Sequence, residues 1–284
     1  MGRGRTLEYP KTAINKVNRY NQRATYDLEQ IHSIINTSSV VHVSFNTPDP
    51  NNPFPVTLPM VGVAASYEHP SASLGEPLDI YLHGYVSSRL MNLSRDANAN
   101  ANANADAAST PPTPTPTPTG LPVTISATKI DGLILTLTPN THDINYRSAV
   151  VYGYATIVTD VAEKLWAMEQ VTNSVVRDRW RFTRLPPDNA EMQSTSILRV
   201  SVVGGSGKIR VGGPRDEQKD LVRDDLRDTV WTGVVPVYEH LGEPVPHKEN
   251  RVKDVPAHVL EYVKDTREAN AKYAADATVD QSQD

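Results

Sequence analysis

The stretch Tyr-Arg-Ser-Ala-Val-Val-Tyr-Gly-Tyr-Ala-Thr-Ile-Val, residues 146–158, has the composition of a long β-strand. After Ser148 it consists mainly of β-branched and aromatic residues, which fit the pleated, half-buried surface of a sheet. Similar stretches recur on both sides of it, with Gly, Pro and Asn between them, as is typical of strands joined by short connections. We therefore predict further strands at 40–45, 54–67, 78–83, 123–130, 133–138, 197–203, 208–211 and 231–238.

Three segments have helical patterns. Asp27 opens a capping-box sequence, after which Leu28, Ile31 and Ile35 form one apolar stripe. Asp160 is the expected cap of a longer helix over 160–175, with Val161, Leu165, Met168 and Val175 on its buried face, and a third helix is expected at 259–275. Many short strands with a few helices predict a mainly β protein, a barrel with helices packed outside it.

Composition excludes several classes of protein. The 284 residues contain no cysteine and carry a net charge of −5, which argues against disulfide scaffolds, thiolate metal sites and a dedicated nucleic-acid binder. The histidines lack zinc-site spacing, so we expect no metal. No apolar run reaches the roughly 20 residues that span a bilayer, and we expect a cytoplasmic protein without a membrane partner. Met1–Thr6 fits the loose myristoylation pattern, and a disordered start is the alternative.

A low-complexity segment interrupts the strand pattern. Asp96–Gly120 is an Ala-Asn repeat followed by Thr-Pro repeats, and it lacks apolar side chains that would offset the entropy of ordering it. We interpret it as a disordered loop insertion in a single domain over 1–240, with a domain boundary as the alternative. Residues 241–284 are charge-dense, which predicts a peripheral tail, partly helical or disordered.

Tyr81–Leu90 predicts an anion site. A strand ends at His83, Gly84 relaxes the backbone, and Ser87 or Ser88 can cap the helix that follows, with Arg89 beside it. Free N–H groups, hydroxyls and a guanidinium at a helix start form a cradle for phosphate. An ordinary capped helix with a solvated arginine is the alternative.

Two other stretches contain residue types that occur in binding sites. Arg147, at the start of the 146–158 strand, cannot be buried cheaply without a carboxylate or an anionic ligand, and an ion pair is the structural interpretation. Gly204–Gly207, followed by Lys208, lacks the Walker pattern, and we predict a hairpin turn there.

Seven short motifs in order resemble the flavin-nucleotide-binding branch of the pyridoxamine 5'-phosphate oxidase-like FMN-binding split barrels, which is related to the 5-nitroimidazole reductases. They are Arg23–Asp27, Phe54–Pro59, Leu82–Gly84 with Ser88–Arg89, Asn145–Val150, the segment from Arg179 to Thr195, Lys208–Gly212 and Trp231–Pro236. The match runs from about Arg19 to Tyr238, interrupted by the insertion. True vitamin B6 oxidases end in a sequence like Trp180–Pro186, which lies mid-chain here, so we infer no B6 phosphate substrate.

The resemblance implies a six-stranded antiparallel Greek-key split barrel and a homodimer with FMN at the subunit interface. It implies that Ser88 and Arg89 bind the FMN phosphate, with Ser87, His83 and Gly84 lining the same site. The other implied cofactor contacts are Asn145, Tyr146, Arg147 and Ser148 at the edge of the ring system, the strand Val56, Leu58, Pro59 and Met60 against the ring, and Trp231 from the partner.

The expected function is that of an FMN-dependent oxidoreductase acting on a small electron acceptor, because a bound flavin carries the redox chemistry and the protein positions it. No catalytic residue stands out. The alternatives are a non-catalytic flavin- or haem-binding module, with His83 as a haem ligand, and a split barrel without a cofactor.

Overall fold

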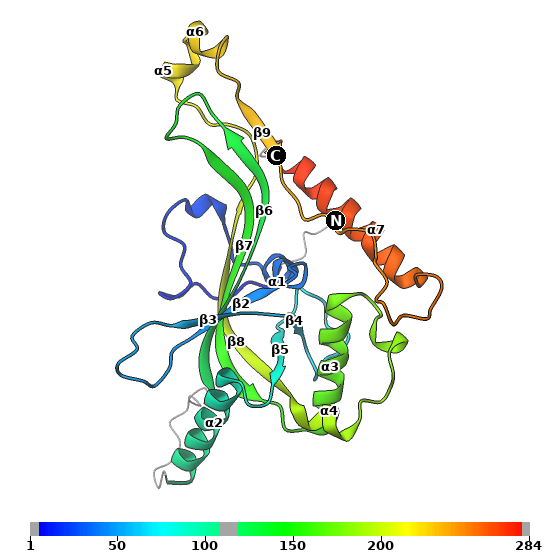
Figure 1. Ribbon diagram of the computed structural model, residues 1–284. Helices are drawn as coiled ribbons and strands as arrows, with labels where there is room; N and C mark the ends of the chain where they lie inside the picture. Colours follow the sequence, from blue (N-terminus) through cyan, green and yellow to red (C-terminus); the bar gives the residue numbers. More distant parts are fainter. Residues whose placement is uncertain (1–5, 108–118, 280–284) are drawn as a thin grey trace. The chain divides into compact units, whose positions relative to one another are not determined.

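The computed structural model describes residues 6–107 and 119–279 (Figure 1). The strands in this part are β1 (Ala24–Thr25), β2 (Val41–Phe45), β3 (Val56–Met60), β4 (Gly62–Ala65), β5 (Asp79–Tyr85), β6 (Leu121–Leu135), β7 (Asp143–Ile157), β8 (Thr195–Arg210) and β9 (Gly233–Pro236). The α-helices are α1 (Leu28–Asn36), α2 (Arg89–Ala107), α3 (Val161–Val175), α4 (Asn189–Ser194), α5 (Gln218–Leu221), α6 (Asp224–Arg227) and α7 (Ala257–Asp276), with short 3₁₀ turns at Asn21–Arg23 and Trp180–Phe182.

The strands form one sheet in the order β3-β2-β6-β7-β8-β5-β4, with β1 beside β8 and β9 beside β6. The two ends of this path, β3 and β4, are not paired with each other, so the sheet is not closed by hydrogen bonds. Only Val61 separates them in the chain, so that they are two halves of one bent strand. Taken this way, and without the short β1 and β9, the sheet has six strands. The predicted mainly β split barrel with flanking helices is confirmed.

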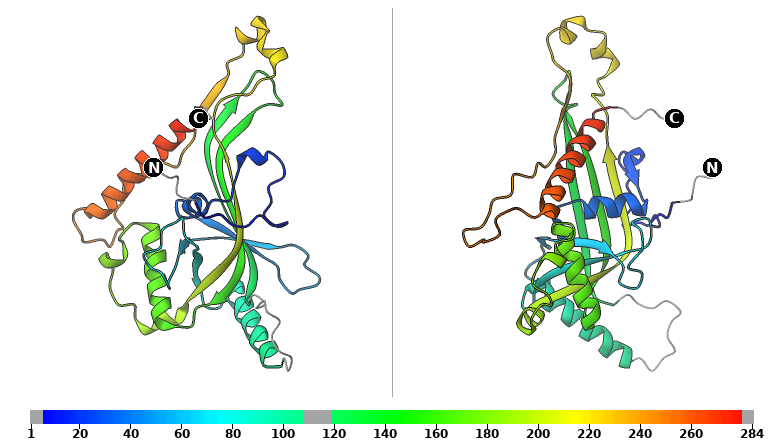
Figure 2. Two further views of the ribbon diagram at one scale, coloured as in Figure 1. Left: turned by 180° about the vertical axis from the view of Figure 1, so that it is seen from behind. Right: turned by 90° about the vertical axis from the view of Figure 1, so that its right-hand side faces the viewer.

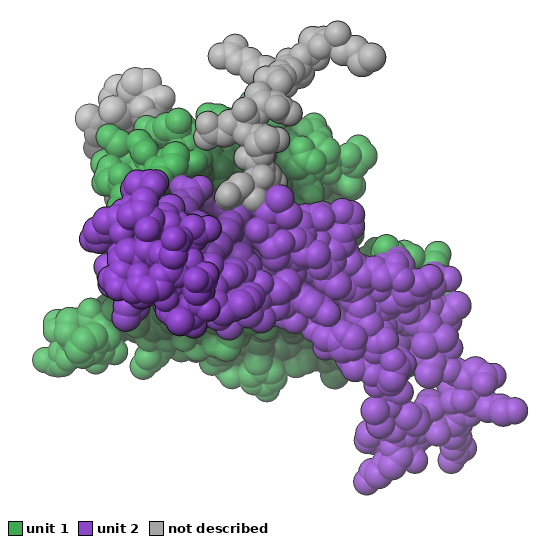
Figure 3. Space-filling model, turned by 90° about the horizontal axis from the view of Figure 1, so that it is seen from above, with its two compact units in different colours: residues 1–127, 149–207 green, residues 128–148, 208–284 purple. Residues whose placement is uncertain are grey.

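The chain divides into two compact units, which Figure 3 shows in green and purple. Unit 1 contains residues 1–127 and 149–207, and unit 2 contains residues 128–148 and 208–284. The long strands β6 and β7 continue from one unit into the other, and β8 ends just beyond the boundary. The expected barrel over 1–240 with a tail over 241–284 stays a prediction.

Unit 1 has its core where α1 and α3 meet the strands β4 and β5 (Figure 2). The predicted start of α1 is confirmed, since the Asp27 carboxylate accepts a hydrogen bond from the Gln30 N–H at 2.9 Å. The helix 160–175 is also confirmed as α3, but its predicted buried face holds only in part, because Met168 packs against the core while Leu165 is 37% exposed. Val161 and Val175 are exposed, whereas Glu163, Ala167 and Val171 are buried. The apolar pattern did not predict this face because the charged residue Glu163 is buried with polar partners.

Two predicted breaks in strands were also wrong. Residues 123–130 and 133–138 belong largely to one strand, β6, and Gly204–Gly207 lies inside the continuous strand β8 rather than in a hairpin turn. The glycines at these places allow close packing. A Cβ on Gly205 would lie 3.0 Å from the Tyr9 ring, and one on Gly132 would lie 2.8 Å from Val234. A glycine within these strands therefore indicates that another segment packs closely against the backbone, and not that the chain turns.

The expected insertion at 96–120 differs from the structure at its start. Helix α2 runs from Arg89 to Ala107 and so includes the first part of the Ala-Asn repeat. Alanine is the strongest helix former, so a helix that has already begun at Arg89 continues through alternating alanines. The Thr-Pro repeats fall almost entirely within 108–118, outside the described residues.

Unit 2 contains the C-terminal helix α7, within two residues of the predicted helix 259–275. It is packed rather than peripheral, because Val263, Ala274 and Ala277 are buried and the Gly212 N–H donates to the Ala277 carbonyl at 2.9 Å. Of the helices in the described ranges, none has both the length and the apolar character needed to cross a membrane.

Candidate functional site

The predicted phosphate cradle lies in unit 1, where β5 ends and α2 begins. β5 is held on both sides, by β4 and by β8, with His83 opposite Ile197 and Gly84 opposite Ser196. The turn after it is tight, since the Ser88 N–H donates to the Tyr85 carbonyl at 2.9 Å. The two strand pairings therefore fix the place at which the nineteen-residue helix α2 starts.

Gly84 is the point at which several predicted site residues meet. A Cβ on Gly84 would lie 2.9 Å from the Met91 Cε, 3.8 Å from the Met60 Cε and 3.9 Å from the Ser88 Oγ. The end of β3 and the start of α2 thus converge on a glycine, and the Met91 side chain packs closely over its backbone. Met60 is remote from Ser88 in sequence, so its nearness is a product of the fold.

The polar side chains of Ser87, Ser88 and Arg89 at the start of α2 have no protein partner among the described residues. Within residues 6–107 and 119–279, no protein partner hydrogen-bonds the hydroxyls of Ser87 and Ser88 or pairs with the Arg89 guanidinium. The expected cap by a serine hydroxyl is therefore not seen. Hydroxyls, a guanidinium and the N-terminal N–H groups of a long helix are left to bind an anion.

His83 and the residues of β3 are also predicted for this site, and of these Met60 lies near Gly84. His83 is exposed, and desolvation by its surroundings lowers the pKa of the imidazole below its usual value, which favours the neutral ring. On β3 the side chains alternate, so Val56, Leu58 and Met60 share one half-buried face while Pro59 is exposed on the other. The structure therefore separates Pro59 from the residues predicted beside it.

The second group of predicted residues belongs to unit 2, and three of them, Asn145, Arg147 and Ser148, have protein partners. Asn145 is fully buried and donates to the carbonyls of Gly212 and Ala277 at 3.0 and 2.8 Å, while it accepts from Arg210 at 2.6 Å. The hydroxyl of Ser148 donates to the Lys208 carbonyl at 3.2 Å. Asn145 thus joins β7 to the end of α7.

Arg147 has the carboxylate partner that its position predicted. Its Nε and Nη2 donate to the two carboxylate oxygens of Asp131 at 3.0 and 2.7 Å. The guanidinium also lies over the Tyr273 ring of α7, 3.3 Å from the centroid. The ion-pair interpretation is confirmed. Tyr146 is half-buried, and Trp231 is 65% exposed with its ring against Gly233.

Sequence reasoning missed a polar network inside unit 1. Tyr81, which is fully buried, donates its hydroxyl proton to Glu163 at 2.9 Å, and the same carboxylate pairs with Arg199 at 3.2 Å. Asp79 lies 3.9 Å from the Arg199 Nε. The one available signal was Glu163 at the start of α3, which the apolar pattern assigned to solvent.

We expect Asp79→Asn to stabilise the protein more at pH 8 than at pH 4.5. Burial, despite the opposing effect of Arg199, raises the pKa of the Asp79 carboxyl to about 6. A raised carboxyl pKa means that the native state binds the proton more tightly than the unfolded chain, so stability falls as pH rises from about 4 to about 6. With solvent screening, the gain at pH 8 is on the order of 1 kcal/mol.

Urea unfolding at both pH values tests this prediction, with Asp49→Asn, at an exposed loop position, as the matched control. Equal effects of Asp79→Asn at pH 8 and pH 4.5 would contradict it.

In the described part of the chain, no group of three or more His, Asp or Glu side chains is arranged to hold a metal ion. The candidate site is therefore the cradle of unit 1, in which Gly84, Met60 and Ser88 meet and Arg89 is open.

Comparison with known proteins relates a part of the chain to a family. Residues 115–209, about a third of the chain, match the family described as pyridoxamine 5'-phosphate oxidase. The matched part includes Asn145–Ser148 but not the cradle. Among curated protein sequences none matches the chain.

Two solved structures share the fold over most of both chains. The flavocytochrome Anf3 from Azotobacter vinelandii is 22% identical, with a TM-score of 0.66, and the alignment covers 90% of this chain and 99% of that one. The FAD and haem binding protein from Mycobacterium smegmatis is 18% identical, with a TM-score of 0.63 and coverage of 84% and 97%. Together with the family match, they confirm the resemblance inferred from the motifs.

Proposed function

We propose that this chain, a split-barrel protein of the pyridoxamine 5'-phosphate oxidase-like type, is a flavin-binding protein whose cofactor phosphate is held at the start of α2. The family match and the flavin-binding proteins among its structural neighbours support the proposal. The observation that carries it is the start of α2, where the hydroxyls of Ser87 and Ser88 have no hydrogen-bond partner and Arg89 has no carboxylate partner among the described residues.

In this proposal each residue of the cradle has a separate task. Arg89 and the hydroxyls of Ser87 and Ser88 bind the phosphate, and the N-terminal dipole of α2 adds to the attraction. Gly84 lets Met91 pack against the end of β5, since any side chain there would meet Met91. Val56, Leu58 and Met60 offer an apolar face for the ring. Asn145 and Arg147, which are engaged with protein partners, act as scaffold in unit 2.

A bound flavin supplies hydride or electron transfer, so the protein itself needs no acid or nucleophile. We propose FMN as the flavin and a small electron acceptor as the substrate. Titration with FMN and with FAD, followed by the visible spectrum, tests binding. Oxidation of NAD(P)H in the presence of a quinone or nitro compound then tests catalysis. Protein that binds neither flavin would contradict the proposal.

His83 favours a second candidate, a haem-binding module. Its imidazole is exposed, and its lowered pKa keeps the nitrogen available to a metal. Two proteins with this fold are described as a flavocytochrome and as a FAD and haem binding protein. A Soret band after haem titration, lost in His83→Ala and kept in His42→Ala, would support this candidate.

We also propose a homodimer formed through the outer sheet face of unit 1. A groove of about 510 Å³ there is lined by Ile14, Pro55, Tyr152, Tyr154 and Val203, among others, and Ile14 and Phe54 are 70% and 74% exposed. Clustered apolar exposure of this kind is typical of protein interfaces. Sedimentation velocity should give twice the chain mass of 31.2 kDa, and a monomer would contradict the proposal.

A further inference from the structure

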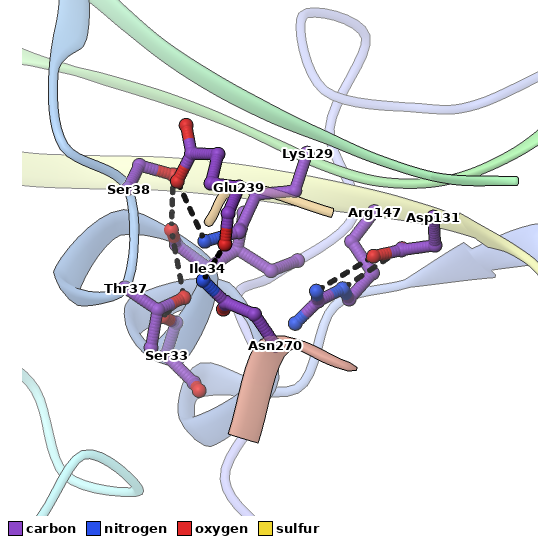
Figure 4. A network of polar contacts seen from close by, with 9 residues as sticks. All are labelled: Ser33, Ile34, Thr37, Ser38, Lys129, Asp131, Arg147, Glu239 and Asn270. Carbon is purple, nitrogen blue, oxygen red and sulfur yellow. Dashed lines mark hydrogen bonds and ion pairs between the residues drawn. The ribbon is translucent and has the colours of Figure 1, made fainter. Parts of the chain in front are cut away.

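Unit 2 contains a cavity of about 240 Å³ beside the strand β6. Its charged and polar lining consists of Lys129, Asp131, Arg147, Glu239 and Asn270, which Figure 4 shows as sticks. Ile130 and Val237 add apolar walls. Since a water molecule takes up about 30 Å³ in the liquid, the cavity has room for a molecule of a few heavy atoms with some water.

Lys129 is the unusual member of this lining. Its side chain is only 8% exposed, whereas Glu239, with which it pairs at 3.4 Å, is 57% exposed. A buried ammonium needs a counter-charge, because its desolvation is costly. Water can solvate the exposed carboxylate of Glu239, so the solvation of Glu239 depends less on this ion pair than that of Lys129 does. Glu239 therefore loses less solvation than Lys129 when this pair separates.

Arg147 brings a second positive charge to the same cavity. Asp131 occupies its Nε and Nη2, and Figure 4 shows the remaining guanidinium nitrogen directed away from that carboxylate. Within the described ranges no residue accepts a hydrogen bond from this Nη1. Stacking on Tyr273 fixes the plane of the guanidinium and so the direction of its free N–H groups.

We propose that this cavity binds a small aliphatic monocarboxylate, which takes the place of the Glu239 carboxylate beside Lys129 and accepts hydrogen bonds from the Nη1 of Arg147. The Glu239 side chain is then an internal counter-ion that competes with the ligand. The short alkyl chain contacts Ile130 and Val237. A cationic ligand would meet two positive groups, and a neutral one would not displace Glu239. The inference does not depend on flavin binding.

Titration of the full-length protein with sodium propionate, followed by NMR or calorimetry, tests the proposal. Glu239→Gln should tighten binding by up to about fivefold, because the competing charge of an exposed pair is removed. Lys129→Met should weaken binding by about tenfold or more, since a charge-assisted hydrogen bond is lost. Glu243→Gln, in an exposed pair with Arg267 elsewhere in unit 2, is the matched control and should change nothing.

Propionamide, a neutral molecule of the same shape, should not bind. Equal binding of propionamide, or unchanged propionate affinity in Glu239→Gln, would overturn the proposal. The visible spectrum of each sample reports flavin content separately. A colourless protein that still binds propionate would leave this inference standing while the flavin proposal fails.

Discussion

Asp131→Ala should destabilise unit 2 by about 3–5 kcal/mol, the usual cost of removing one partner of a buried ion pair. Asp131 and Arg147 are 3% and 13% exposed, and two hydrogen bonds of 2.7 and 3.0 Å join them. Without the carboxylate, the guanidinium has only the Tyr273 ring as a partner and stays desolvated. Urea unfolding, with hydrogen exchange to assign the transition to unit 2, measures the loss.

Asp178→Asn is the matched control for this prediction, because asparagine tolerates the left-handed backbone of this position, with φ of 63°. It breaks the ion pair with Arg181, in which the two side chains are 52% and 65% exposed, and such pairs contribute less than about 1 kcal/mol. The double variant Asp131→Ala/Arg147→Met should recover much of the lost stability, because it also removes the unpaired charge. If Asp131→Ala costs no more than Asp178→Asn, the buried pair is not what holds this part of β6 to β7.

Arg89→Ala should weaken flavin binding by about 10- to 150-fold, corresponding to the 1.5–3 kcal/mol of a charged hydrogen bond. The expected loss of affinity comes from the ligand contact itself, because Arg89 is the first residue of α2 and has no ion-pair partner among the described residues. Removal of its charge should leave the fold intact. The dissociation constants for FMN and FAD, measured by quenching of flavin fluorescence, test the prediction.

Arg181→Ala serves as the control, since it removes an exposed arginine of unit 1 elsewhere on the chain. It should leave flavin affinity unchanged. Arg89→Lys should keep part of the affinity, because a lysine supplies charge without the planar fork of a guanidinium. Equal flavin affinity in Arg89→Ala and wild type would remove the cradle from the proposed site.

Local features of the sequence predicted the helices α1, α3 and α7 and most strand segments. The Asp27 cap and the α1 stripe depend on residues at most a few positions apart, as does the cap of α3 by Asp160, which accepts from the Glu163 N–H at 2.7 Å. The groups proposed to bind the phosphate could also be predicted from the sequence, since they lie within one stretch from His83 to Arg89. Capping, alternation and helix-end electrostatics act over a few residues, so a linear sequence contains them.

Long-range contacts decided the rest. The sequence predicts breaks in the strands at Gly132 and Gly205. Both positions need glycine because a residue from elsewhere in the chain packs closely against the backbone, Val234 and Tyr9 respectively. The partner of Arg147 lies on β6, and the C-terminal segment belongs to a packed unit because Ala277 meets Asn145. The sequence alone determined which residues can form strands, caps and an anion cradle. Only the tertiary structure decided which of these charges are paired, because pairing depends on burial and on contacts between remote segments.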